Sequence, residues 1–226
     1  MASLRNLHPY ALRADLIAAA HHWFTTRAAI CAGSRRADRF AAFGEGAVMC
    51  FPPAALYGES AIRVGADTLI GPYVSLSAGM APGQPLINDR IVQIGERCLI
   101  GRFSSIVGHL EVVIEDDVFF GPNVYVTDQN HATADPTLPI GRQSAPERAV
   151  RIGRGSWLGA NVVVLPGVTI GAGVAVGAGS VVTTDLPDRT LAVGSPARVV
   201  RDLDRDESTA DAAQDRVVQG MSAHEA

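Results

Sequence analysis

The 226-residue sequence contains no lysine, so all 19 basic residues are arginine. A contact with a phosphate or a carboxylate must therefore come from arginine, a hydroxyl group or a backbone amide. Positive charge is not in surplus either: the formal net charge is −4, and residues 202–226 hold seven acidic residues against two arginines. This balance argues against a nucleic-acid-binding protein, which needs a basic surface.

Cysteines and long apolar runs are also scarce. The three cysteines, Cys31, Cys50 and Cys98, do not have the spacing of a metal or redox motif. No apolar run approaches the length of about 18 residues that a membrane helix needs, and the N-terminus lacks the apolar stretch of a signal peptide. We therefore expect a cytoplasmic protein that requires no metal.

What the sequence does contain is a repeat of six residues between Val64 and about Leu186. Each hexad begins with a large apolar residue, usually followed by glycine or an acid, and a small residue comes fifth. This period fits neither an α-helix nor a two-faced strand; hexapeptide repeats are instead typical of parallel β-helices. The dipeptides that begin the hexads are Val64-Gly65, Ile70-Gly71, Ile94-Gly95, Ile100-Gly101, Ile114-Glu115, Phe120-Gly121, Ile152-Gly153, Leu158-Gly159, Ile170-Gly171 and Val176-Gly177.

Three hexads form one triangular coil, with the apolar residues stacked inside. We predict an all-β fold with a β-helix domain over residues 43–201, in which 43–63 form a degenerate first coil. Three interruptions break the repeat: an insertion at 82–93, two extra residues near Val112 and a long insertion at 132–151. Insertions in repeat proteins map to loops and often to the binding face, so the long insertion directly after His131 is the first candidate for a functional site.

The two ends of the chain lie outside the repeat. Residues 1–42 form an N-terminal segment, and an apolar stripe that includes Leu16, Ile17 and Phe24 predicts a helix over 9–32, ending before Gly33. The simplest interpretation is a helical cap on the open end of the coil; a helix on a membrane surface is the alternative. Residues 202–226 are acidic and poor in large apolar groups, which predicts a solvated tail with at most a marginal helix around 210–218.

Of the six histidines, only His109 and His131 lie within the repeats. Imidazole changes its protonation near neutral pH and is a competent general base. Two histidines so far apart do not form a catalytic zinc site, which needs about three protein ligands, so a carbonic anhydrase is disfavoured.

The segments GPNVYVTDQNHATADPTLPI, VRIGRGSWLGANVVVLPGVTIGAGVAVGAGSVVTTDLP and AVGSPARVV resemble the hexapeptide-repeat acyltransferases. The resemblance covers roughly residues 43–201 and is strongest to the maltose/galactoside O-acetyltransferases and the polysaccharide-biosynthesis acetyltransferases. It implies a left-handed parallel β-helix. It also implies a homotrimer, with acetyl-CoA as acyl donor and the active site between neighbouring subunits.

The same resemblance assigns roles to particular residues. His131 matches the catalytic base, and His109 is expected to fill a turn. Asp128 either orients the His131 ring or caps a corner of the coil. Asn123 either lines the acceptor pocket or forms a Pro-Asn turn.

For the cofactor, Trp157 matches the aromatic residue that flanks the pantetheine arm, although an aromatic residue at a subunit interface has the same appearance. Backbone amides of Gly159, Ala160 and Ala178 are expected to bind that arm, and Ala160 stands where relatives often have serine. Thr183 and Thr184 fall where relatives often have Thr-Lys facing the phosphates. Because the lysine is missing, Arg198 and Arg201 are the available substitutes.

Together these features predict acetyl transfer to a hydroxyl group of a sugar or glycan precursor, by direct transfer without an acyl-cysteine. Two alternatives remain: N-acetylation of a nucleotide-linked amino sugar, and a non-catalytic hexapeptide module used for assembly. The acceptor itself is not specified by any motif.

Overall fold

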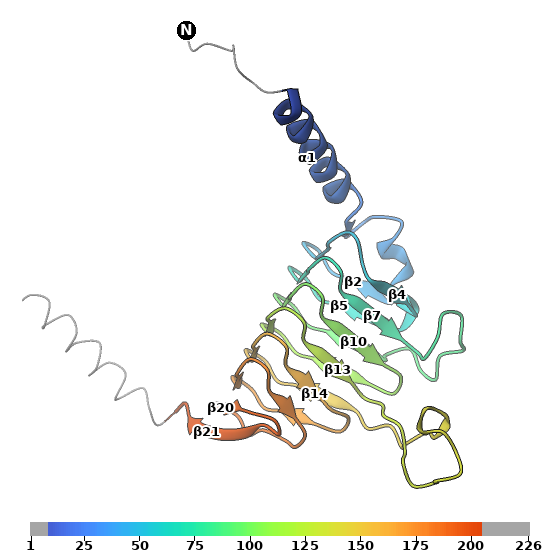
Figure 1. The fold of residues 1–226 in the computed structure, drawn as a ribbon, viewed down its shortest axis with the longest axis vertical. Helices are drawn as coiled ribbons and strands as arrows, with labels where there is room; N and C mark the ends of the chain where they lie inside the picture. Colours follow the sequence, from blue (N-terminus) through green and yellow to red (C-terminus); the bar gives the residue numbers. More distant parts are fainter. Residues whose placement is uncertain (1–8, 205–226) are drawn as a thin grey trace, which may run out of the picture.

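A computed structural model describes residues 9–204, and its main body is a prism of three β-sheets whose strands are parallel except at the two ends of sheet 1 (Figure 1). Successive strands along the chain lie on the three faces in turn. Sheet 1 has the strand order β1 (Ile30–Cys31), β3 (Val48–Met49), β6 (Leu69–Ile70), β9 (Leu99–Ile100), β12 (Phe119–Phe120), β15 (Trp157–Leu158), β18 (Ala175–Val176), β20 (Thr190–Val193) and β21 (Arg198–Asp202).

The other two faces hold six strands each. Sheet 2 contains β4 (Ala55–Tyr57), β7 (Ser75–Ala78), β10 (Ser105–Gly108), β13 (Tyr125–Thr127), β16 (Val163–Val164) and β19 (Val181–Val182). Sheet 3 contains β2 (Ala42–Phe43), β5 (Ile62–Val64), β8 (Val92–Ile94), β11 (Val112–Ile114), β14 (Val150–Ile152) and β17 (Thr169–Ile170).

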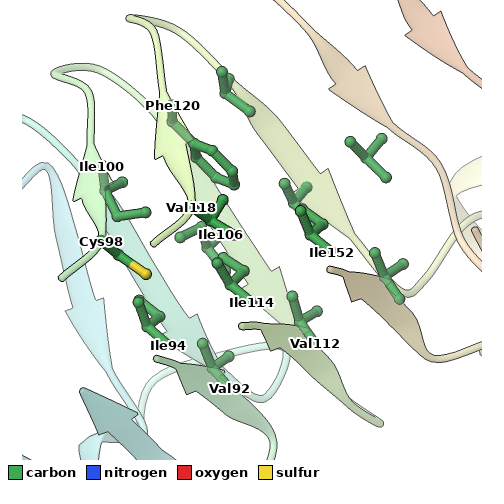
Figure 2. Packing of buried hydrophobic residues seen from close by; sticks show 14 of the residues in the cluster. Val92, Ile94, Cys98, Ile100, Ile106, Val112, Ile114, Val118, Phe120 and Ile152 are labelled. Atoms are coloured by element: carbon green, nitrogen blue, oxygen red, sulfur yellow. The ribbon is translucent and has the colours of Figure 1, made fainter. Parts of the chain in front are cut away.

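The register of the strands confirms the predicted hexads. On sheet 3, Val64, Ile94, Ile114, Ile152 and Ile170 lie directly above one another in successive coils. All of these residues are buried, and the equivalent residues of the other two sheets meet them inside the prism (Figure 2). Cys98 lies in the same interior, where burial raises the pKa of its thiol. The left-handed parallel β-helix predicted from the sequence is confirmed.

Glycine is needed where one coil passes directly under the next. A Cβ atom added to Gly101 would lie 2.3 Å from the carbonyl oxygen of Gly121, whereas one added to Gly141 would meet no atom within 4 Å. We expect Gly101→Ala to cost about 1–3 kcal/mol of unfolding free energy, because the two backbones must move apart. Gly141→Ala is the matched control, and its thermal midpoint should stay at the wild-type value. Equal midpoints for the two variants in a thermal melt would contradict this account.

The N-terminal helix is shorter than predicted. Helix α1 covers Pro9–Arg27 rather than 9–32, because Ile30 and Cys31 form strand β1, which pairs antiparallel with β3. The helix also extends away from the coil (Figure 1), and its Leu16, Ile17 and Trp23 are exposed.

The N-terminal end of the coil is covered by the segment that follows the helix. Ile30, Ala37 and Phe40 are buried in the same core as the hexad residues. The helix reaches the coil through its last turns, where the Phe24 ring packs edge-on against Phe51 at a centroid distance of 5.3 Å.

At the C-terminal end, β20 continues sheet 1 and β21 folds back on it as an antiparallel strand. Three short 3-10 helices complete the described elements: Ala37–Arg39, Glu59–Ala61 and Ile140–Arg142. The predicted tail lies outside the described residues except for 202–204, as does the predicted helix around 210–218. Within residues 9–204, no helix is both long enough and apolar enough to span a bilayer.

Candidate active site

The long insertion after β13, residues 132–151, leaves the coil and returns to it at the same place. We call this segment the excursion. His131 pairs with Ser144 in an isolated antiparallel bridge, and the Ala132 N–H donates to the Gln143 carbonyl over 3.0 Å. These contacts close the base of the excursion, and His131 lies there on the surface, in an exposed position. The structure therefore fixes the backbone on both sides of this histidine.

A cavity of about 430 Å³ lies beside His131. Its wall combines the end of sheet 2 with both arms of the excursion. The polar side chains that line it are those of Tyr125, Thr127, Gln129, Asn130, His131, Arg142, Ser144 and Glu147. Met80, which precedes the 82–93 insertion, also lines the cavity, whereas no residue of that insertion does.

Asp128 is wholly buried but is not directed at the His131 ring. Its carboxylate accepts hydrogen bonds of 2.8–3.0 Å from the backbone N–H groups of His109, Leu110 and Glu111. Burial raises the pKa of this carboxyl group, and the three backbone hydrogen bonds oppose that effect. The interpretation in which Asp128 orients His131 is wrong, because both carboxylate oxygens are committed to the turn at 109–111. The alternative, a carboxylate that caps a corner of the coil, is what the structure shows.

Of the residues that line the cavity, only His131 was predicted from the sequence. Arg142 and Glu147 both line it, and Glu147 contacts the Nδ1 atom of His109. His109 indeed belongs to a turn, as expected, but its ring also binds a residue of the cavity. The sequence feature that could have indicated Glu147 is its position near the end of the excursion, where the chain must return toward His131.

Trp157 does not share this cavity. It belongs to β15 on sheet 1, whereas His131 follows β13 on sheet 2. Its side chain is 50% exposed and continues an outward-facing apolar row, in which Leu69, Leu99, Phe119 and Trp157 occupy equivalent positions in successive coils. The structure thus places the predicted base and the predicted cofactor aromatic on different faces of the coil.

The backbone amides expected to bind the pantetheine arm differ in their availability. The Gly159 N–H donates to the Val176 carbonyl over 2.8 Å as part of the coil, so this N–H group is not available to a ligand. No hydrogen bond among the described residues uses the N–H of Ala160 or Ala178. Both residues lie in the turn that joins sheet 1 to sheet 2, where their amides remain candidates.

Asn123 lies in the same corner as Ala160, one coil earlier. Its φ is +60°, and its side-chain amide donates to the Asn161 Oδ1 atom over 3.2 Å. It does not line the His131 cavity. Within this chain Asn123 therefore forms a Pro-Asn turn, the second of its two interpretations.

The residues expected to contact the nucleotide gather toward the C-terminal end of the coil but on two faces. Thr183 and Thr184 are exposed just after β19 of sheet 2, and Arg198 and Arg201 are exposed on β21 of sheet 1. Arg198 donates to the carbonyl of Ala197 over 2.8 Å. Among residues 9–204, no group of three or more histidine, cysteine or acidic side chains could hold a metal ion.

Comparison with known proteins supports the resemblance seen in the sequence. Residues 149–184 match the family described as bacterial transferase hexapeptide (six repeats). A probable acetyltransferase of Mycobacterium tuberculosis is 39% identical over 110 residues, which cover 49% of this chain and 37% of that protein. The galactoside O-acetyltransferase of Lactococcus lactis is 39% identical over 99 residues, which cover 44% of this chain and 47% of that protein. The chain thus spans less than half the length of these relatives.

Among solved structures, AntD from Bacillus cereus is similar in fold. AntD is an N-acyltransferase, and this structure contains dTDP and 3-hydroxybutyryl-CoA. The TM-score is 0.63 with 20% identity, and the match covers 83% of this chain and 94% of that one. The predicted resemblance to hexapeptide-repeat acyltransferases is confirmed.

Proposed function

We propose that this protein transfers an acetyl group from acetyl-CoA to a hydroxyl group of a sugar or glycan precursor. The observation that carries the proposal is the position of His131, exposed at the closed base of the excursion beside a cavity that several polar side chains line. The names of the relatives, which include acetyltransferases and a galactoside O-acetyltransferase, support it. A cytoplasmic location, expected from the sequence, suits the proposed donor.

In the proposed reaction, His131 takes the proton of the acceptor hydroxyl as its oxygen attacks the thioester carbonyl. The new C–O bond forms, the C–S bond breaks, and the sulfur leaves as a thiolate that takes the proton back from the imidazolium. The Ala160 N–H is available to stabilise the negative charge on the carbonyl oxygen. The described cysteines are not needed, and none of them lines the cavity.

We also propose that the working unit is a homotrimer with its site between subunits. The row formed by Leu69, Leu99, Phe119 and Trp157 exposes large apolar groups along sheet 1, and such a continuous surface is typically covered by a partner or a ligand. A neighbouring subunit that brings its sheet 1 beside the sheet 2 edge of this one would unite Trp157 with His131. Sedimentation should give the mass of a trimer, and a monomer would contradict the arrangement.

The proposed function is tested by thiol release from acetyl-CoA with paired acceptors, a neutral galactoside and the matching amino sugar. We expect turnover with the hydroxyl acceptor. Turnover with the amino sugar alone would instead favour N-acetylation. If calorimetry detects no binding of coenzyme A to the protein, the enzyme proposal fails and a module for assembly becomes the better account.

Trp157→Ala should weaken coenzyme A binding about tenfold, because it removes an aromatic wall from the pantetheine arm. The matched control is Leu99→Ala, which truncates the same apolar row two coils earlier. Calorimetry should show normal coenzyme A affinity for the control. If both substitutions weaken subunit association, and the fraction of each variant that is still trimeric binds coenzyme A with wild-type affinity, Trp157 is an interface residue only.

A further inference from the structure

His109 and Glu147 form a pair of polar side chains beneath the cavity. The Nδ1 atom of His109 contacts the Oε1 atom of Glu147, and the two side chains are 12% and 25% exposed. The other ring nitrogen, Nε2, is buried without a hydrogen-bond partner. Among the described residues, Glu147 is therefore the only polar group that holds this ring.

Both members of the pair are attached to rigid backbone. The buried Asp128 carboxylate fixes the turn that carries His109. On the other side, the Arg148 N–H donates to the Asp128 carbonyl over 2.9 Å, and the Val150 N–H donates to the Glu111 carbonyl over 3.0 Å. Glu147 thus stands where the excursion has already rejoined the coil, and its position does not depend on the exposed part of the loop.

The Glu147 carboxylate also lines the cavity that contains His131. Its Oε1 atom faces His109, while no hydrogen bond within residues 9–204 uses its Oε2 atom. A carboxylate whose rotamer is fixed by a second residue, here by His109, is well suited to accept a hydrogen bond from a ligand. Tyr125, Asn130 and Arg142 add further polar groups around the same space.

We propose that Glu147 binds the acceptor through a hydroxyl group other than the one that is acetylated, and that His109 is the residue that positions it. This inference rests on the proposed function and deepens it, because it requires an acceptor with a second hydroxyl donor near the reacting one. A sugar ring meets that requirement. A simple alcohol does not.

The test is a binding cycle that does not depend on turnover. Methyl β-galactoside and its monodeoxy analogues are titrated by calorimetry into the intact protein and into Glu147→Gln. One deoxy analogue should bind the wild-type protein about tenfold more weakly than the parent sugar, because a hydrogen bond to a charged group is lost. In Glu147→Gln, the parent sugar and that analogue should bind equally weakly.

His109 is tested as a positioning residue by two substitutions. His109→Ala removes the group behind Glu147 and should raise the KM for the galactoside severalfold, leaving the KM for acetyl-CoA unchanged. His109→Asn keeps an N–H donor close to the place of Nδ1 and should restore much of the lost affinity. Glu111→Gln is the control: its side chain, which accepts from Gln93, does not line this cavity, so acceptor binding should match the wild type.

The outcomes separate this inference from the proposed function. The inference is overturned if the ratio of each analogue's Kd to that of the parent sugar is the same in the wild-type protein and in Glu147→Gln. It is also overturned if the wild-type protein binds no sugar of the series. A purely structural pair would lower the thermal midpoint of the His109 variants with no change in either KM, which also overturns it. If the cycle behaves as expected but no acetyl transfer occurs, the proposed reaction fails and the sugar site remains.

Discussion

His131→Ala is expected to lower kcat/KM for acetyl transfer by about 10²–10⁴-fold, the range that a general base contributes. No other histidine of the described chain lines the cavity, so nothing in it replaces the lost imidazole. Coenzyme A should bind the variant with nearly wild-type affinity, because Trp157, Ala160 and Ala178 lie on other strands and turns. Turnover is measured by thiol release, and coenzyme A affinity by calorimetry.

His22→Ala is the matched control for this experiment. His22 is an exposed histidine of α1, far along the chain from the excursion, and its carbonyl accepts from the Thr26 hydroxyl. We expect full activity in this variant. Retained activity in His131→Ala would remove the base from the proposed reaction, whereas loss of both activity and coenzyme A binding would indicate a disturbed fold rather than lost chemistry.

Most of the fold could be predicted because each hexad specifies a short strand and also the residue that this strand places in the interior. A large apolar residue every six positions both forms the short strand and fills the interior, so the stacking of Ile94, Ile114 and Ile152 follows from the sequence alone. The N-terminal segment obeys no such rule. Its helix ends at Arg27 because Ile30 and Cys31 pair with β3, a tertiary contact that the helical pattern does not contain.

The candidate site was only partly predictable. A sequence motif places His131 near a long loop, but it does not say which hydrogen-bonding groups the coil has already used. Gly159 matches a cofactor position, yet its N–H is committed to the coil. Glu147 carries no motif, and it becomes a candidate only because the returning arm of the excursion places it in the cavity.

The role of Asp128 was likewise left open by the sequence, and its substitution is the second change for which we expect a large effect. We expect Asp128→Ala to lose about 2–4 kcal/mol of unfolding free energy, because the N–H groups of His109, Leu110 and Glu111 would lose their acceptor. For a chain of this size, such a loss lowers the thermal midpoint by roughly 10 °C. Asp128→Asn should fall between wild type and Asp128→Ala, since the amide keeps the shape and one acceptor oxygen. Calorimetric melting measures all three midpoints.

The control is Asp135→Ala, which removes an exposed carboxylate that accepts from the N–H and hydroxyl of Thr137. Water can replace those bonds, so its midpoint should stay close to that of the wild type. A second readout separates a structural role from a catalytic one. When the acid that orients a catalytic histidine becomes its amide, kcat falls by about 10⁴-fold. Because Asp128 is bonded to the turn and not to His131, Asp128→Asn should keep kcat within about threefold of wild type at a temperature where it remains folded. A fall of several thousandfold in that folded variant would return Asp128 to the catalytic machinery.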